Sequence, residues 1–235
     1  MKTVGIDSCP QGWFYIALNE NGDYELGIDP FIYTLCEKQA DANLMLIDVP
    51  IGLPEDKPRQ CDQEARRLLA PERSSSVFPV PCRKAVYAKN YEEAVKTNKE
   101  ELGASVSKQS WAICKRISQV DSFLTNPDHA TPYLRESHPE VCFWAMNSHQ
   151  PLQHSKKKTE GMRERIAVLQ KVWPKSAAIY NEAVEEFKRK DLGRDDILDA
   201  LVLAVTAMVS HNKLKSVAPV EYDQHGLPME IVYYG

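Results

Sequence analysis

The first 30 residues alternate between short apolar runs and compact polar turns. Apolar runs rich in β-branched and aromatic side chains cover residues 3–8, 12–18 and 23–28, and polar turns separate them at residues 10–12 and 19–22. Runs of this length and composition predict strands, and the Asn-Gly pair in the second turn is typical of a tight hairpin. The chain therefore begins with a predicted antiparallel meander of three strands.

A helix and a fourth strand follow the meander. Ile32, Leu35 and Cys36 recur at helical spacing between residues 31 and 40. Residues 44–49 are apolar except for Asp48, which is typical of a strand buried on both faces of a helix-covered sheet. The succession of meander, helix and returning strand predicts a mixed sheet of the α/β class.

The stretch from residue 51 to about residue 130 has no strand pattern. It contains helical patterns at residues 60–69, 91–102 and 111–124, and a proline-rich loop at residues 73–83. Because such a long connection without strands is unusual inside a compact domain, we interpret it as a helical insertion after the fourth strand. The whole chain, residues 1–235, is then one domain.

The second half predicts a fifth strand and then mostly helices. The strand falls at residues 132–137, and a turn at residues 223–226 separates two short strands at the end of the chain. The predicted helices cover residues 139–146, 160–172 and 177–190, followed by a long helix that begins at Asp195.

Composition narrows the class of protein. The 235 residues carry a net charge of −4, so any nucleic acid must bind at a local basic patch. The six cysteines are scattered without a Cys-x-x-Cys pair, which favours reduced thiols over disulfides or zinc. Residues 197–209 are apolar but short and interrupted by Asp199, and the first residues lack a signal-peptide pattern. We expect a cytoplasmic protein without a membrane partner. The sequence does not determine its oligomeric state, and a homodimer is one of the alternatives.

Four aspartates end or begin predicted elements in a suggestive way. Asp7 ends the first strand, Asp48 ends the fourth strand, and Asp196 and Asp199 lie in the first turns of the last helix. Taken singly, each has an ordinary explanation, such as turn capping or favourable interaction with the helix dipole. Together, carboxylates within ~4–6 Å of one another need a cation, and oxygen ligands suit Mg²⁺ or Mn²⁺. Two such ions could hold a phosphodiester during its hydrolysis.

This arrangement resembles the ribonuclease H-like superfamily, and more narrowly a family of predicted ribonuclease H-like nucleases. The superfamily order is three antiparallel strands, a helix, a fourth strand, and a later helix that carries the last acids. The narrower resemblance rests on segments spread over the chain: Gly5-Ile6-Asp7 with Gly12-Trp13, Ile47-Asp48-Val49-Pro50-Ile51-Gly52-Leu53, Arg73-Ser74-Ser75-Ser76-Val77-Phe78, Glu136-Ser137-His138-Pro139-Glu140-Val141-Cys142-Phe143, Lys158-Thr159 with Gly161, and Asp195-Asp196-Ile197-Leu198-Asp199-Ala200-Leu201.

The resemblance implies a ribonuclease H-like fold and a two-metal nuclease that uses Mg²⁺ or Mn²⁺. Asp7 would bridge both ions, Asp48 would take the place of the fourth-strand acid, and Asp196 and Asp199 would complete the ligands. Glu140 is a further catalytic candidate outside the general superfamily scheme.

Three further polar residues have two interpretations each. Glu136 and Glu140 are either extra ligands or partners that orient a basic residue. His138 is either a proton shuttle or, more commonly for a histidine before proline, a loop or capping residue.

The basic residues suggest where a substrate could bind. Arg73 beside Ser75 would form a pocket for a phosphate or carboxylate group, and Lys158 is a further substrate-binding candidate. We expect Lys156 and Lys157 to belong to the solvated surface, as most lysine runs do.

Two other functions remain open at this point. One is a non-catalytic protein that binds nucleic acid or a nucleotide, or that regulates another protein. The other is a phosphotransferase of the actin and sugar-kinase type, which Pro10 disfavours because it removes a phosphate-binding N–H from the turn after Asp7.

Overall fold

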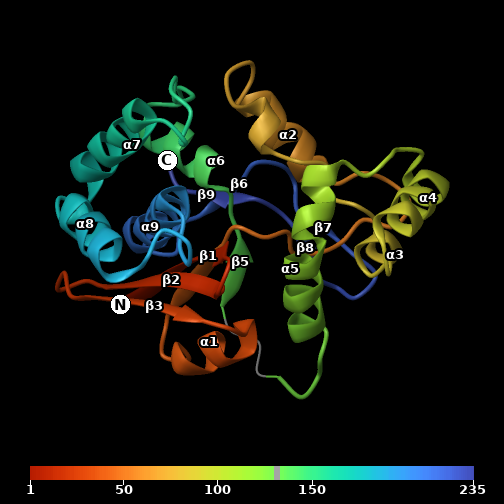
Figure 1. The fold of residues 1–235 in the computed structure, drawn as a ribbon, viewed down its shortest axis with the longest axis horizontal. Helices are drawn as coiled ribbons and strands as arrows, with labels where there is room; N and C mark the ends of the chain where they lie inside the picture. The colour runs from red at the N-terminus through yellow and green to blue at the C-terminus, as the bar shows by residue number, and fades with distance from the viewer. Residues whose placement is uncertain (130–132) are drawn as a thin grey trace.

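A five-stranded mixed sheet lies at the centre of the computed structural model, which describes residues 1–129 and 133–235 (Figure 1). The predicted meander, the buried fourth strand and the fifth strand are confirmed, although Pro132 of the predicted fifth strand lies outside the described residues. Across the sheet the strands are β3 (Tyr24–Asp29), β2 (Gly12–Asn19), β1 (Lys2–Cys9), β4 (Leu44–Ile47) and β5 (Leu134–Glu136).

Strand β1 is the middle of the sheet and determines where the acids go. It pairs antiparallel with β2 and parallel with β4, and β4 pairs parallel with β5. Ile6 of β1 lies opposite Ile47 of β4, so the next residues, Asp7 and Asp48, lie side by side where β4 ends. Asp7 is still paired with Phe14 of β2, because β1 continues to Cys9. The carboxyl ends of parallel strands share an edge, and this edge carries the candidate site.

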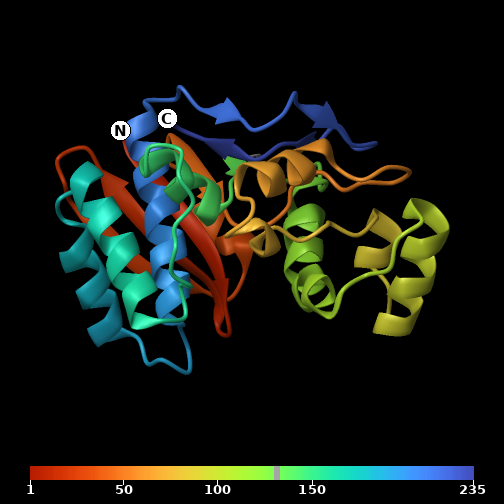
Figure 2. The same cartoon turned by 90° about the horizontal axis from the view of Figure 1, so that it is seen from above.

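Helices cover both faces of the sheet, as the continuous apolar pattern of β4 predicts (Figure 2). One face packs against the second-half helices, and the other face packs against α1 (Ile32–Lys38) and α5 (Lys108–Leu124). The second-half helices are α6 (Pro139–Met146), α7 (Thr159–Val172), α8 (Ser176–Glu186) and α9 (Arg194–Ser210).

Helix α9 lies directly on β1 because Gly5 leaves room for it. A Cβ atom added to Gly5 would lie 2.0 Å from the carbonyl oxygen of Ala200 and 2.3 Å from the amide nitrogen of Ala204. The small residues of α9 let the two backbones approach, and the helix is buried almost all round from Ile197 to Met208. This close contact brings the first turns of α9 to the edge where Asp7 lies.

The segment between β4 and β5, interpreted above as an insertion, is helical and contains no strand among its described residues. It contains a 3₁₀ turn (Ser74–Ser76), which lies inside the proline-rich loop predicted at residues 73–83, and four helices, of which α3 (Arg83–Val86) begins at the last residue of that loop. Helices α3 and α4 lie at the end of the molecule opposite α8 (Figure 2). The helices of the insertion are α2 (Gln60–Leu68), α3 (Arg83–Val86), α4 (Tyr91–Leu102) and α5.

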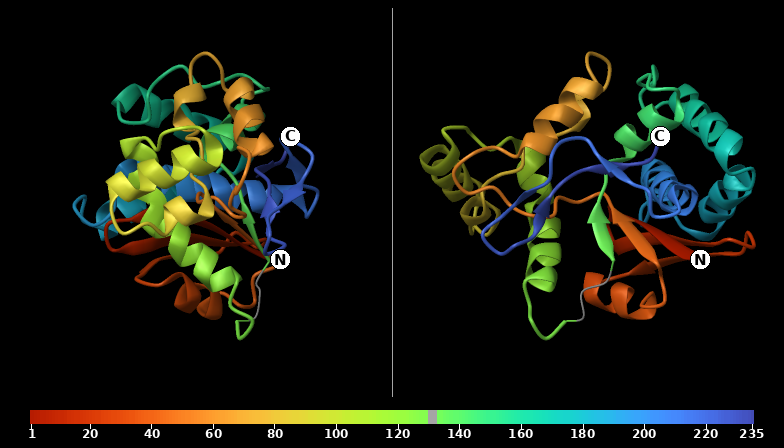
Figure 3. Two further views of the ribbon diagram at one scale, coloured as in Figure 1. Left: turned by 90° about the vertical axis from the view of Figure 1, so that its right-hand side faces the viewer. Right: turned by 180° about the vertical axis from the view of Figure 1, so that it is seen from behind.

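The end of the chain runs along one side of the molecule and joins its two halves (Figure 3). The predicted turn at residues 223–226 is confirmed between β7 and β8, whereas the ribbon of β6 and β9 has no counterpart in the prediction. These four strands are β6 (Lys215–Ser216), β7 (Glu221–Tyr222), β8 (Pro228–Met229) and β9 (Val232–Tyr233).

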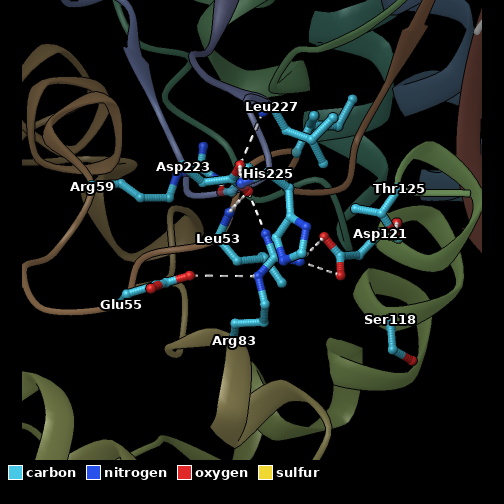
Figure 4. Close-up of polar contacts among 12 residues, drawn as sticks. Leu53, Glu55, Arg59, Arg83, Ser118, Asp121, Thr125, Asp223, His225 and Leu227 are labelled. Carbon is cyan, nitrogen blue, oxygen red and sulfur yellow. Dashed lines mark hydrogen bonds and ion pairs between the residues drawn. The ribbon is translucent and has the colours of Figure 1, made fainter. Parts of the chain in front are cut away.

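An arginine of α3 fastens the insertion to this terminal segment (Figure 4). Arg83 donates to the carboxylate of Asp121 on α5 at 2.5 Å and also to Asp223 in the terminal turn. Asp223 in addition accepts the backbone N–H of Leu53 at 3.0 Å. The network holds α3, α5 and the terminal hairpin together on the side of the molecule away from α8.

None of the helices in the described parts of the chain combines the length and the apolar character needed to cross a membrane.

A candidate metal centre at the edge of the sheet

Three of the predicted acids meet at the edge where β1 and β4 end. One carboxylate oxygen from each of Asp7, Asp48 and Asp199 can be chosen so that all three lie within 4.8 Å of one another. Asp7 and Asp48 come from adjacent parallel strands, and Asp199 comes from the second turn of α9. We call these three residues the acid triad.

The acid triad is an unfavourable place for negative charge. Asp7 is 6% exposed and Asp199 is 1% exposed, whereas Asp48 is half-buried. Burial, followed by the charges of Asp48 and Asp199, holds the pKa of Asp7 well above its usual range. Burial also raises the pKa of Asp199 to about 7, with Asp48 adding to the increase and Lys156 opposing it. A cation at this point would remove the repulsion.

The carboxylate oxygens of the triad are only partly satisfied by hydrogen bonds. Oδ1 of Asp7 accepts the backbone N–H of Ser8 at 2.6 Å. Oδ1 of Asp199 and Oε2 of the neighbouring Glu140 are buried and have no hydrogen-bond partner among the described residues. A buried carboxylate oxygen without a partner is costly, and hard oxygen ligands suit Mg²⁺ or Mn²⁺. The residues present therefore fit the divalent ion that the sequence predicts.

Lys156 supplies a cation to the triad, and the prediction that it belongs to the solvated surface is wrong. Its Nζ donates a hydrogen bond to Asp199, and its side chain is 34% exposed. Burial disfavours the ammonium, but Asp199, Asp7 and Asp48 outweigh that effect and raise the pKa of Lys156. The neighbouring Lys157 is exposed as expected, although it also lines the cavity described next.

A cavity of about 340 Å³ opens over the triad, between the edge of the sheet and the insertion. Its size falls within the usual range for small-molecule sites. Asp196 lines it but lies outside the set of converging oxygens, and its carboxylate accepts the N–H of Gly193 at 3.1 Å, which caps α9. Ile113 of α5 and Phe78 contribute apolar wall.

The other buried acids of the cavity each have a buried arginine. Glu136 accepts from Arg59 at 2.6 Å, and Arg59 also lies 3.4 Å from Asp62. Glu140 accepts from Arg165, and both arginines are almost fully buried. Both Glu136 and Glu140 therefore pair with a basic residue, as one of their two interpretations predicts. Glu140 keeps one oxygen free toward the cavity.

His138 caps a helix, as the more common interpretation predicts. Its Nδ1 accepts the backbone N–H of Glu140 at the start of α6, at 3.2 Å. His138 also lines the cavity, where its Nε2 lies 3.3 Å from the carbonyl oxygen of Ser76, and it makes no hydrogen bond to an acid within the described residues.

The predicted substrate-binding residues lie outside the cavity lining. Arg73 donates through Nε to the carbonyl oxygen of Leu152 at 2.8 Å, Ser75 is exposed, and Lys158 is an exposed residue at the start of α7. Of the serines in this turn, Ser76 is the one that reaches the cavity.

Comparison with known families places the chain. Residues 5–221 match the family described as protein of unknown function (DUF429), so the chain belongs to this family. Comparison with curated proteins and with solved structures gave no match.

Sequence reasoning missed the cations of the site. Lys156, Arg59 and Arg165 all pair with acids that are 25 or more residues away in the chain. No local pattern distinguishes Lys156 from Lys157 and Lys158 beside it. The path of the loop before α7 brings Lys156, the first lysine of the run, to the acid triad.

Proposed function

We propose that this protein is a metal-dependent nuclease that hydrolyses phosphodiester bonds with Mg²⁺ or Mn²⁺ held by the acid triad. The observation that carries the proposal is the convergence of three carboxylates, two of them almost fully buried, at the floor of a cavity. Such a cluster is stable only with cations, and carboxylate-bound ions at the edge of a sheet are suited to phosphoryl chemistry.

The ion supplies Lewis acidity and lowers the pKa of a bound water when it is present. The protein fixes the positions of the carboxylates that would bind the ion. Asp7 lies in the central strand β1, Asp48 directly follows the adjacent strand β4, and Asp199 lies on a helix packed on β1, so regular elements fix the ligands. A site built on strands and helices holds its geometry better than one built on loops.

The cavity walls support a substrate that carries phosphate. Apolar residues such as Ile113 and Phe78 exclude water on the side of the insertion, and Lys156 and Lys157 place positive charge on the opposite side. Exclusion of water strengthens the electrostatic interactions inside the site. The order of the sheet, 3-2-1-4-5, and the spread of resembling segments over the chain favour nucleic acid as the substrate.

A cleavage assay tests the proposal. End-labelled single-stranded, duplex and branched DNA, and the matching RNAs, are incubated with the protein in Mn²⁺, in Mg²⁺ and in excess chelator. We expect cleavage by the wild type with either metal, none with chelator, and a loss of at least about 100-fold in Asp199→Asn. Asp195→Asn is the matched control, because Asp195 lies on the same helix outside the triad.

Two outcomes would contradict the proposal. Equal cleavage by the wild type and Asp199→Asn preparations would show that the activity comes from a contaminant. Absence of cleavage on every substrate, with the metal shown to be bound, would favour a binding protein that keeps the metal but lacks the reaction.

A further inference from the structure

The acid triad differs from the other buried acids in how its charge is balanced. Glu140 pairs with Arg165, and Glu136 and Asp62 share Arg59; both arginines are buried and always charged. The triad has three carboxylates but a single ammonium, that of Lys156, within the parts of the chain that the structure describes. For the triad alone, the charge that remains equals that of one divalent ion; Asp196 also acts on Asp7, but its carboxylate accepts the N–H of Gly193 and lies outside the converging oxygens.

The ammonium of Lys156 lies beside the three carboxylates of the acid triad, which attract a cation. Its hydrogen bond goes to Asp199, and the charges of Asp7 and Asp48 act on it as well. Lysine offers three N–H donors, and Asp199 is the acceptor of its one hydrogen bond within the described residues. The remaining donors are available to a phosphate oxygen in the cavity.

The loop that carries Lys156 is held in place on one side by two side chains. Arg73 donates to the carbonyl oxygen of the buried Leu152 at 2.8 Å. The carboxylate of Glu164, on α7, accepts the backbone N–H groups of residues 153 and 154, each at 3.0 Å. These bonds fix the backbone immediately before Lys156.

A glycine and an arginine of α7 hold the same loop from the other side. A Cβ atom at Gly161 would lie 2.0 Å from the carbonyl oxygen of Ser155, so the loop packs against α7 only because position 161 has no side chain. Arg165, the partner of Glu140, also donates to the carbonyl oxygen of His154 at 3.1 Å. The lysine is therefore positioned by the fold, unlike the exposed Lys157 that follows it.

We propose that Lys156 is a permanent cation of the centre and takes the place of a second metal ion, so that the acid triad binds one divalent ion. This inference rests on the proposed function for its chemical meaning and replaces the two ions that the ribonuclease H-like resemblance implies. One set of three ligand oxygens converges within 4.8 Å among the described residues, which matches one ion. With one ion and the ammonium, the three charges of the triad are balanced.

The number of bound ions tests the inference directly. Mn²⁺ is titrated into the metal-free protein by calorimetry, and the bound ions are examined by electron paramagnetic resonance, which detects spin coupling between ions ~4 Å apart. We expect one uncoupled Mn²⁺ per chain in the wild type. In Lys156→Ala we expect two ions per chain and a coupled signal, because the ammonium no longer fills the second position. Lys157→Ala should bind one ion, as the wild type does.

Lys156→Met is the second variant, since it keeps most of the side-chain volume and removes the charge. It should bind the first Mn²⁺ at least about 10-fold more tightly than the wild type, because one competing positive charge is gone. Circular dichroism confirms that each variant is folded before titration.

The results separate this inference from the proposed function. Two coupled ions in the wild type, or one ion in both the wild type and Lys156→Ala, would overturn the role of Lys156 and leave a metal-dependent nuclease intact. No bound ion in the wild type would overturn both. One ion in the wild type and two in Lys156→Ala, without cleavage of any nucleic acid, would support the role of Lys156 and contradict the nuclease.

Discussion

Replacement of Asp7 by asparagine should change stability in opposite directions with and without metal. Asparagine has nearly the same shape, and its carbonyl oxygen can still accept the N–H of Ser8 that Oδ1 of Asp7 accepts at 2.6 Å. Its amide can donate to the neighbouring carboxylates of Asp48 and Asp199. The variant therefore removes a buried negative charge without leaving a cavity or an unpaired donor.

In the metal-free protein we expect Asp7→Asn to be more stable than the wild type. Burial and the charges of Asp48 and Asp199 raise the pKa of Asp7, so its ionised form is disfavoured in the fold. At pH 8 the same carboxylate is in water in the unfolded chain and bears no such cost. Its replacement should therefore raise the free energy of unfolding by about 1–3 kcal/mol, the size typical of a buried polar group without compensation. For a chain of this size that is a rise of about 2–12 °C in Tm.

With metal the order should reverse. At a concentration 100 times its Kd, an ion that binds only the folded wild type adds about 2.7 kcal/mol, or about 5–11 °C in Tm. Asp7→Asn lacks one of the three converging ligands and should show little of this shift.

Thermal unfolding followed by circular dichroism measures both effects at pH 8 and pH 5. Each protein is examined with chelator and with Mn²⁺ at roughly 1–10 mM, a concentration high enough to fill a weak divalent-ion site. Because the penalty grows as pH rises above the unfolded pKa, the advantage of the variant should be smaller at pH 5 than at pH 8. It should vanish only below the ordinary value of 3.8, where Asp7 is protonated in both states. A Mn²⁺ shift of equal size in both proteins would show that Asp7 is not a ligand. A metal-free variant less stable than the wild type at pH 8 would refute the argument about buried charge.

Three further predictions concern stability and use urea or thermal unfolding. The pKa of Asp199 is about 7 in the fold and 3.8 ordinarily, so the metal-free wild type should lose stability as pH rises from about 4 to about 7. Excess Mn²⁺ should remove that loss. A metal-free stability that does not change with pH in this range would contradict the prediction. Gly5→Ala should lower the free energy of unfolding by about 3 kcal/mol or more, because the added Cβ would lie 2.0 Å from the backbone of α9. In the control Gly103→Ala the added Cβ meets no atom within 4 Å, so the loss should be only about 1 kcal/mol, caused by the positive φ. Equal losses would show that α9 does not pack so closely on β1. Glu140→Leu should cost about 3–5 kcal/mol by leaving Arg165 buried without its partner, and the double variant Glu140→Leu with Arg165→Met should recover most of it; no recovery would mean that the pair is not the cause.

Local patterns in the chain were sufficient for the elements and for part of the site. Period-two apolar runs, the Asn-Gly turn and the unbroken β4 run predict the mixed sheet, because strand pairing near β1 depends on short loops and on burial of neighbouring runs. The same patterns put Asp7 and Asp48 near strand ends, although β1 continues to Cys9, and parallel pairing of β1 with β4 brings the two acids together. Asp199 could be chosen because it lies one turn inside an apolar helix, where a solvated acid is out of place.

Helix-capping chemistry was also readable from the sequence. His138 before Pro139 predicts a cap at the start of α6, and the structure shows that cap. Asp196 shows the limit of this reasoning, since it matches the family spacing but its carboxylate caps α9 beside the triad.

Only the tertiary structure decided which positive charges belong to the centre. The pairs of Lys156 with Asp199 and of Arg59 with Glu136 join residues 43 and 77 positions apart, and no propensity or periodicity extends over such distances. Lysines are placed on the surface by default because burial of an ammonium costs free energy, and that default fails where several buried carboxylates outweigh the cost. The acids of this protein could be found in its sequence because strand and helix ends localise them. Their cation could not, because a loop pinned by Gly161, Glu164 and Arg73 is what carries Lys156 to them.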